Sequence, residues 1–209
     1  MKLKGDYFDE NYVKFDVDEG VIKNRAGTRL LGLSEDFLKG FRKAVMEETG
    51  EAHHVVFETC GKTWGENLAQ RFQKETSLYY ESEFQALPMS MFSLLFKNFW
   101  SRHGWGELDI DWEQGYRDGV FEVAVHNPAF SSIFDAEGLN DDIFTGVLSA
   151  FFSRFAGQEL ECFQTEEHVS EEGVRLSRFL LALPDRLGRV PDMVLSQKSH
   201  QEIVQAVKS

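Results

Sequence analysis

The chain has 209 residues, a size that suits one domain with a substantial core, and its 42% hydrophobic content is typical of a folded rather than a disordered protein. Its net charge of −13, from 22 basic and 35 acidic residues, argues against a nucleic-acid-binding protein, whose surface must be basic to meet phosphates. The two cysteines, Cys60 and Cys162, are too few for a disulfide framework, and we expect free thiols.

Signals for membrane insertion or export are not evident in the sequence. No apolar run approaches the roughly 18 residues that a transmembrane helix needs. Residues 1–5 are not followed by the apolar core of a secretory signal, so we expect a cytoplasmic protein without a membrane span.

Phenylalanine is frequent, with 19 residues against 5 tyrosines and 4 tryptophans. These rings carry a large apolar face and no polar group. They either fill an aromatic core or line a cavity for a flat apolar ligand, and both interpretations stay open.

The first quarter of the chain predicts an arm and a helix. Residues 1–26 form the arm, in which residues 12–17 are expected to form a short strand. Ser34 is a favourable helix N-cap, and Gly50 ends a helix whose apolar residues recur at helical spacing.

An apolar run with valine and phenylalanine at residues 53–59 predicts a buried strand. Residues 60–65 then predict a turn into a second helix that extends to Phe72. Gly61 and Gly65 flank a lysine and a threonine, but the first glycine of a phosphate-binding loop is missing. We therefore interpret Gly61 as a turn residue and Gly65 as a point of close helix packing.

The middle of the chain predicts a helix followed by a strand. Pro88 suits the first turn of a helix that extends to about His103 and has a broad apolar face. Alternating apolar and acidic residues predict a half-buried strand at residues 108–113, followed by a turn. Its acidic residues are Asp109, Asp111 and Glu113. Such a cluster can bind a cation, but it is also what a solvated strand face looks like, and we favour the second interpretation.

The C-terminal half predicts a strand, a helix and two more strands. The first strand, residues 119–126, alternates in polarity and ends before Pro128, which cannot donate to a ladder. A long apolar helix follows from about Asn140 to Ala156, and Gly157 ends it. The last two strands are expected at residues 158–165 and 174–182.

Several short patterns follow one another along this half. They are Asn127-Pro128-Ala129-Phe130, the apolar helix over residues 144–155, Glu161-Cys162, Gly173 and Ser177-Arg178-Phe179. In this order they resemble the C-terminal half of the 4-vinyl-reductase-type family of small-molecule-binding domains, and a weaker likeness extends over residues 29–72. Ser177 stands where the family has its second cysteine, so any metal or redox role of paired cysteines is open here.

The predicted fold class is α+β, with an antiparallel sheet of four to five strands and helices mainly on one face. The expected organisation is an N-terminal arm at 1–26, a ligand-binding domain at 27–183, and an irregular linker with a mobile tail at 184–209. A short helix is expected at residues 201–207. The resemblance also implies a similarity to TRAPP transport-complex subunits, which dimerise through helices, so we expect a homodimer through the first helix or the helix at 88–103.

The leading functional hypothesis is a non-catalytic binding domain for an apolar or tetrapyrrole-like small molecule. The resemblance implies a role in chlorophyll handling or photosystem assembly, and it leaves the cofactor unknown with a tetrapyrrole as a candidate. The candidate ligand-binding residues are Trp64, Phe92, Phe96, Trp100, His103, Phe144, Phe151 and Phe155.

Two alternatives stay open: a vinyl reductase that acts on a chlorophyll precursor with an external electron donor, and a dimeric protein–protein adaptor without a ligand. No catalytic residue is assigned, because the sequence has neither a dinucleotide-binding glycine motif nor a serine nucleophile motif. No histidine pair has metal-site spacing, so no metal site is predicted. His103 is a candidate axial ligand of a tetrapyrrole metal or, alternatively, a helix cap.

Overall fold

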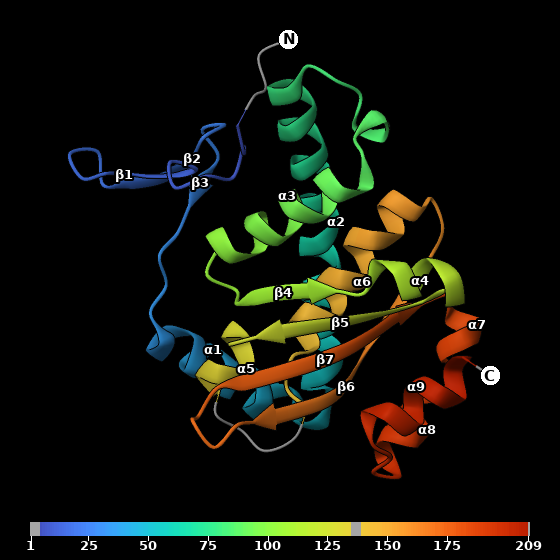
Figure 1. Cartoon of the computed structure of the whole chain (residues 1–209). Helices are drawn as coiled ribbons and strands as arrows, with labels where there is room; N and C mark the ends of the chain where they lie inside the picture. Colours follow the sequence, from blue (N-terminus) through green and yellow to red (C-terminus); the bar gives the residue numbers. More distant parts are fainter. Residues whose placement is uncertain (1–4, 135–138, 209) are drawn as a thin grey trace.

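The computed structural model describes residues 5–134 and 139–208, and its centre is a four-stranded antiparallel sheet in the order β4-β5-β7-β6 (Figure 1). The strands are β4 Glu107–Ile110, β5 Val120–His126, β6 Glu161–Val169 and β7 Arg175–Ala182. The predicted α+β fold with an antiparallel sheet and packed helices is confirmed. Residues 1–4, on which the expectation about a secretory signal partly depends, lie outside the described residues.

Three helices cover the inner face of this sheet. They are α2 His53–Tyr80, α3 Met89–Arg102 and α6 Asp142–Ala156. Val123 and Val125 of β5 and Phe179 and Leu181 of β7 belong to the core that these helices share with the sheet. The predicted positions of α3 and α6 are therefore confirmed, including the end of α6 at Gly157, which adopts a left-handed conformation with φ 65°.

The predicted strand and turn at residues 53–65 are wrong, because both lie inside α2. The reason is the helical spacing of the buried side of α2, where Phe57, Gly61, Gly65 and Leu68 recur every three to four residues. Gly61 and Gly65 let α2 press against the backbone of α6, since a Cβ atom at Gly61 would lie 2.2 Å from the Ile143 carbonyl oxygen. Gly61 is thus a packing residue and not a turn residue.

Short helical segments connect the main elements. They are η1 Gly50–Ala52, η2 Phe84–Ala86, α4 Trp112–Asp118 and α5 Ala129–Phe134. Helix α4 replaces the predicted end of the strand at 108–113, because the Asp111 side chain caps the helix by accepting a 2.9 Å hydrogen bond from the Gln114 backbone N–H. Asp111 and Glu113 therefore do not share a strand face with Asp109.

The N-terminal arm forms its own three-stranded sheet of β1 Val13–Asp16, β2 Val21–Asn24 and β3 Arg29–Leu30, which lies apart from the main sheet in Figure 1. The predicted strand in the arm is confirmed. Buried Tyr7 and Phe8 attach the arm to the core, and the Tyr7 hydroxyl donates a 3.1 Å hydrogen bond to buried Glu75 of α2. Helix α1, Glu35–Thr49, follows and has no buried residue, although its predicted bounds are correct.

The predicted linker and mobile tail after Pro184 are wrong as far as the structure describes them. The chain forms α7 Pro184–Leu187, α8 Val190–Leu195 and α9 His200–Lys208, which lie against the outer face of the sheet (Figure 1). Leu187, Val190 and Ile203 are fully buried there against Val120 and Leu180. The expected short helix at 201–207 is confirmed within α9.

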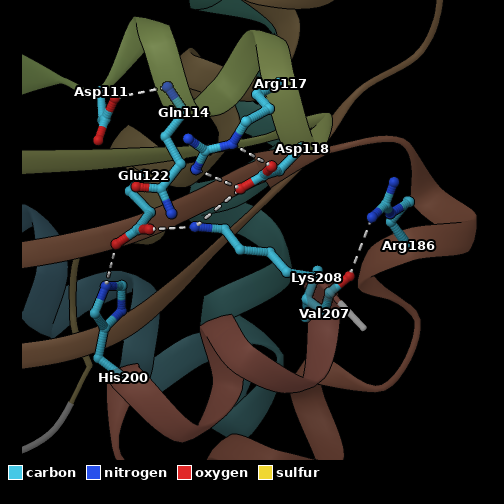
Figure 2. A network of polar contacts seen from close by, with 9 residues as sticks. All are labelled: Asp111, Gln114, Arg117, Asp118, Glu122, Arg186, His200, Val207 and Lys208. Carbon is cyan, nitrogen blue, oxygen red and sulfur yellow. Dashed lines mark hydrogen bonds and ion pairs between the residues drawn. The ribbon is translucent and has the colours of Figure 1, made fainter.

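A polar network fixes α9 to β5. Lys208 donates a 2.7 Å hydrogen bond to one oxygen of Glu122, and His200 lies 3.2 Å from the other oxygen (Figure 2). Burial raises the pKa of Glu122, but the hydrogen bonds from Lys208 and His200 outweigh it, so its net pKa shift is downward. The network therefore keeps Glu122 ionised, and it adds polar contacts to the small aliphatic cluster that holds α7–α9 on this face.

No helix in the described part of the chain is both long and apolar enough to cross a membrane.

Candidate functional site

A cavity of about 900 Å³ opens at the C-terminal end of α6. Its walls come from segments far apart in the sequence: α2, η2, the start of α3, α4, β5 and the ends of α6 and β7. This volume lies in the range of about 300–1,000 Å³ that is usual for small-molecule sites. The cavity is therefore the candidate functional site.

Seven aromatic residues contribute to the apolar wall, together with aliphatic residues such as Leu87, Ile110 and Leu181. The aromatic residues are Phe84, Phe92, Trp112, Tyr116, Phe121, Phe152 and Phe155. Phe84 stacks on Phe155 with ring centroids 4.7 Å apart, and Trp112 meets Phe121 edge-on at 5.8 Å. The Trp112 indole N–H donates a 2.8 Å hydrogen bond to the Ser93 hydroxyl, which holds the ring in place. A wall of this kind suits a flat or greasy molecule.

The polar part of the wall carries one charge. It consists of Gln73, Gln85, Gln158 and Arg154, in addition to the Tyr116 hydroxyl. Arg154 lies in the last turn of α6, where a cation complements the helix dipole, and its guanidinium donates a 3.3 Å hydrogen bond to the Gln73 side chain. These amides and the guanidinium can orient a polar group at one end of a bound apolar molecule.

The structure divides the predicted ligand-binding residues into two groups. Phe92 and Phe155 line the cavity. Phe96, Trp100, Phe144 and Phe151 are at most 1% exposed and belong to the closed core, where Phe96 packs on Phe151 at 4.4 Å. A ligand contact for these four residues stays a prediction, and it would require the core to open.

Trp64 and His103 lie away from the cavity lining. Trp64 of α2 packs edge-on against Trp105 at 4.8 Å. The His103 ring stacks on Trp105 at 4.4 Å, and its Nδ1 donates a 2.7 Å hydrogen bond to the Phe99 carbonyl. Burial lowers the pKa of His103 to about 4, so the ring is neutral at pH 7. His103 is thus part of the aromatic core at the end of α3, and its role as a metal ligand stays a prediction.

Sequence reasoning missed most of the cavity. Trp112 was expected on a half-buried strand, and Phe121 fell within the alternating strand predicted at residues 119–126. Phe84 stands in a segment without any motif, and Phe152 lies in the apolar helix over residues 144–155, whose pattern does not distinguish it from its neighbours. The one usable signal was the apolar residue type, which wall and core positions share, so only the three-dimensional arrangement separates them.

A second polar group of side chains lies buried under the sheet at the start of α6. Asp141 is fully buried and accepts hydrogen bonds from the Ser131 backbone N–H at 3.1 Å and from the Ser177 hydroxyl. The Asp141 backbone N–H donates to the Gln164 side chain at 2.9 Å. Burial raises the pKa of Asp141 to about 6. These contacts connect α6 to β6 and β7, so we assign this group a structural role.

The next features are the candidate metal ligands and the two cysteines. No cluster of three or more His, Cys, Asp or Glu side chains there could hold a metal ion. The two cysteines are free, as predicted, with Cys60 exposed and Cys162 buried. Burial raises the pKa of the Cys162 thiol, which leaves it protonated and unreactive at neutral pH.

Comparisons with known proteins bear on the fold. No family model matches the sequence, and no curated protein matches it significantly. Among solved structures, the phenol-responsive sensory domain of the transcription activator PoxR, with phenol, matches 88% of this chain and 90% of that chain at a TM-score of 0.62 and 14% identity. An H-NOX domain studied for heme distortion matches 76% of this chain and 77% of that chain at a TM-score of 0.46 and 15% identity. At such identities the first likeness shows a shared fold, and the second is too distant to carry an argument.

Proposed function

We propose that this chain is a non-catalytic binding domain for an apolar or tetrapyrrole-like small molecule, which occupies the cavity at the end of α6. The observation that carries the proposal is the cavity itself, at about 900 Å³ with seven aromatic residues in its wall. The shared fold with the phenol-responsive domain supports it, because that protein responds to a small aromatic compound. The cavity includes Phe92 and Phe155 of the predicted ligand-binding residues.

The family remains a proposal as well. The resemblance to 4-vinyl-reductase-type domains supports a ligand from chlorophyll handling, and a tetrapyrrole is the candidate that follows from it. The Glu161-Cys162 pair that carries part of the resemblance lies on β6, and Cys162 is buried in the core near the sheet. Neither Glu161 nor Cys162 lines the cavity, so the part of the resemblance that they carry supports the family and says nothing about ligand binding.

Titration of the purified protein tests the proposal. Mg-protoporphyrin, chlorophyllide, haem and the neutral dye N-phenyl-1-naphthylamine are added in turn, and tryptophan quenching and ligand spectra are followed. We expect saturable binding of at least one compound with quenching of Trp112, because Trp112 is the tryptophan in the cavity wall. Absence of binding by all four compounds would overturn the proposed function.

A cavity-filling variant locates the binding site. Ala156 lines the cavity and is exposed at the end of α6, so Ala156→Trp should fill part of the space without disturbing the core. We expect the affinity for the bound compound to fall about tenfold or more, as loss of about 1.4 kcal/mol of binding free energy would give. Leu195→Trp is the control, because Leu195 is 81% exposed on α8 and does not line the cavity. Equal affinity for both variants would place binding elsewhere.

A homodimer remains part of the proposal, with α1 as the contact. Of the two helices expected to dimerise, α3 buries Phe92, Leu95 and Phe99 in the core, with Met89 and Leu94 left exposed. Helix α1 instead leaves Phe37 and Phe41 55% and 47% exposed, an arrangement that also fits the adaptor alternative. Sedimentation analysis over a range of concentrations tests it, and a monomer throughout would contradict it.

A further inference from the structure

The charge of the cavity wall differs from that of the whole chain. The protein has 35 acidic residues against 22 basic ones. Among the described residues that line the cavity there is no aspartate or glutamate, and the one charged side chain is Arg154. Because the wall has no carboxylate and its one charge is positive, it favours an anion over a cation as ligand.

Arg154 is available to such an anion. In the described part of the chain its guanidinium forms no ion pair with a carboxylate, and its one hydrogen bond, to the Gln73 side chain, is 3.3 Å long. Four of the ten other arginines are instead paired with carboxylates in the described part of the chain. These are Arg25 with Asp9, Arg117 with Asp118, Arg175 with Glu167 and Arg178 with Glu166. A guanidinium has five N–H groups in a planar fork, so most of the donors of Arg154 are free to bind a ligand.

Neutral donors lie on the same wall as Arg154. Gln73 of α2, Gln85 of η2 and Gln158 after α6 are also lining residues, and a side-chain amide can donate to an acidic group without adding charge. The aromatic wall, with Phe84 and Phe155 stacked at 4.7 Å, offers a surface for an apolar body. Arg154 is an exposed side chain, so it would meet an anion as a charge-assisted donor that stays open to water on one side and has this apolar surface on the other.

We propose that the ligand is an organic anion, with an apolar aromatic or alkyl body against the ring wall and one acidic group held by Arg154. This inference rests on the proposed binding function and narrows it to a class of ligand. The acidic group is a carboxylate or a group of similar charge and geometry, because a guanidinium binds such groups through paired N–H donors. A neutral ligand of the same body would bind through the aromatic wall alone.

Two dyes with the same aromatic skeleton, one anionic and one neutral, test whether the cavity prefers an anion. The anion is 8-anilinonaphthalene-1-sulfonate, and its neutral counterpart is N-phenyl-1-naphthylamine, which lacks the sulfonate. Fluorescence titration of the full chain should show tighter binding of the anion than of the neutral dye, with Ala156→Trp weakening both. In Arg154→Gln we expect the affinity for the anion to fall about tenfold, the size of one charge-assisted hydrogen bond, and the affinity for the neutral dye to stay within about twofold.

Matched variants exclude a general effect of charge or stability. Arg189→Gln makes the same change of net charge at an exposed position on the other side of the sheet, and it should alter neither affinity. Arg154→Lys should retain most of the preference for the anion, because it retains the charge. If Arg154 only complements the dipole of α6, Arg154→Gln will lower thermal stability without changing the ratio of the two affinities.

The outcomes separate the two proposals. Binding of both dyes with no selective loss of the anion in Arg154→Gln overturns the inference about charge and leaves the binding function intact. If neither dye binds, and the tetrapyrroles also fail to bind, the proposed function fails, and the inference fails with it.

Discussion

The two faces of the main sheet are held by different kinds of contact. On the inner face, α2 and α6 meet through Gly61, Gly65 and Gly146, where backbone touches backbone and aromatic rings fill the rest of the core. On the outer face, α7–α9 pack on a small aliphatic cluster and are tied to β5 through Glu122, His200 and Lys208 (Figure 2). The stability of the inner face therefore depends on close packing, which tolerates little change in side-chain volume. The outer face depends partly on ion pairs, so its contacts can be weakened one at a time.

The glycine contact gives the largest expected effect. Gly61→Ala would place a Cβ atom 2.2 Å from the Ile143 carbonyl oxygen, so the two helix backbones must separate. We expect a loss of about 3 kcal/mol in the free energy of unfolding, the upper part of the usual range for overpacking. Chemical denaturation followed by circular dichroism measures it.

Gly40→Ala in α1 is the control for this prediction. No atom outside its own helix lies within 4 Å of a Cβ at Gly40, so the substitution should stabilise the helix by up to about 1 kcal/mol through helix propensity. Opposite signs for the two variants would confirm that the inner face is limited by space. A similar small gain in both would show that the helices can move apart freely.

Asp141 is a titratable group buried on the inner face, so its contribution to stability should depend on pH. Its pKa is raised from 3.8 to about 6, so between pH 4 and pH 6 the folded protein holds a proton that the unfolded chain has released. The contribution of Asp141 to stability therefore falls as pH rises through this window and levels off above it. At about 1.4 kcal/mol per pKa unit, the total fall is about 3 kcal/mol.

Asp141→Asn removes this titration and leaves an acceptor for the Ser131 backbone N–H. We expect the stability of the variant relative to the wild type to rise by about 3 kcal/mol between pH 4 and pH 7. Urea denaturation at several pH values measures the difference, and other titrating groups cancel in the comparison. A difference that does not change with pH would show that Asp141 ionises in the folded protein as easily as in the unfolded one.

The sheet, α1, α3 and α6 could be predicted because their signals are local. Alternation marked β5, Ser34 and Gly50 delimited α1, and Gly157 ended α6. The error at residues 53–65 arose because Val55 and Val56 favour a strand locally. In the structure they lie on the outer side of α2, 64% and 40% exposed, and the packing of glycines against a helix some 80 residues further along the chain decides the conformation.

The sequence does carry a signal for the packing of α7–α9 on the outer face. Val120, Leu180 and Ala182 are apolar at outward positions of β5 and β7, which a solvated face would not favour, and they predict that something covers the outer face. The cavity had no such signal. Phe155 lines it and Phe151 is closed in the core, yet both are phenylalanines on α6, one turn apart.

The outer face gives the smallest expected effect. Lys208→Met removes the ammonium that bridges Glu122 and Asp118 at 2.7 Å and 3.9 Å while retaining much of the apolar stem. Since the Lys208 side chain is only 14% exposed, we expect a loss of about 1 kcal/mol, or a melting temperature lower by about 2–4 °C. Lys198→Met is the control, because the pair of Lys198 with Glu202 is about half exposed on both sides and should contribute close to nothing.

If the tail loosens in Lys208→Met, amide hydrogen exchange should accelerate in α9 and stay slow in α2, because the two faces open independently. Equal acceleration in both helices would mean that the sheet transmits the loss of charge on one face to the packing on the other.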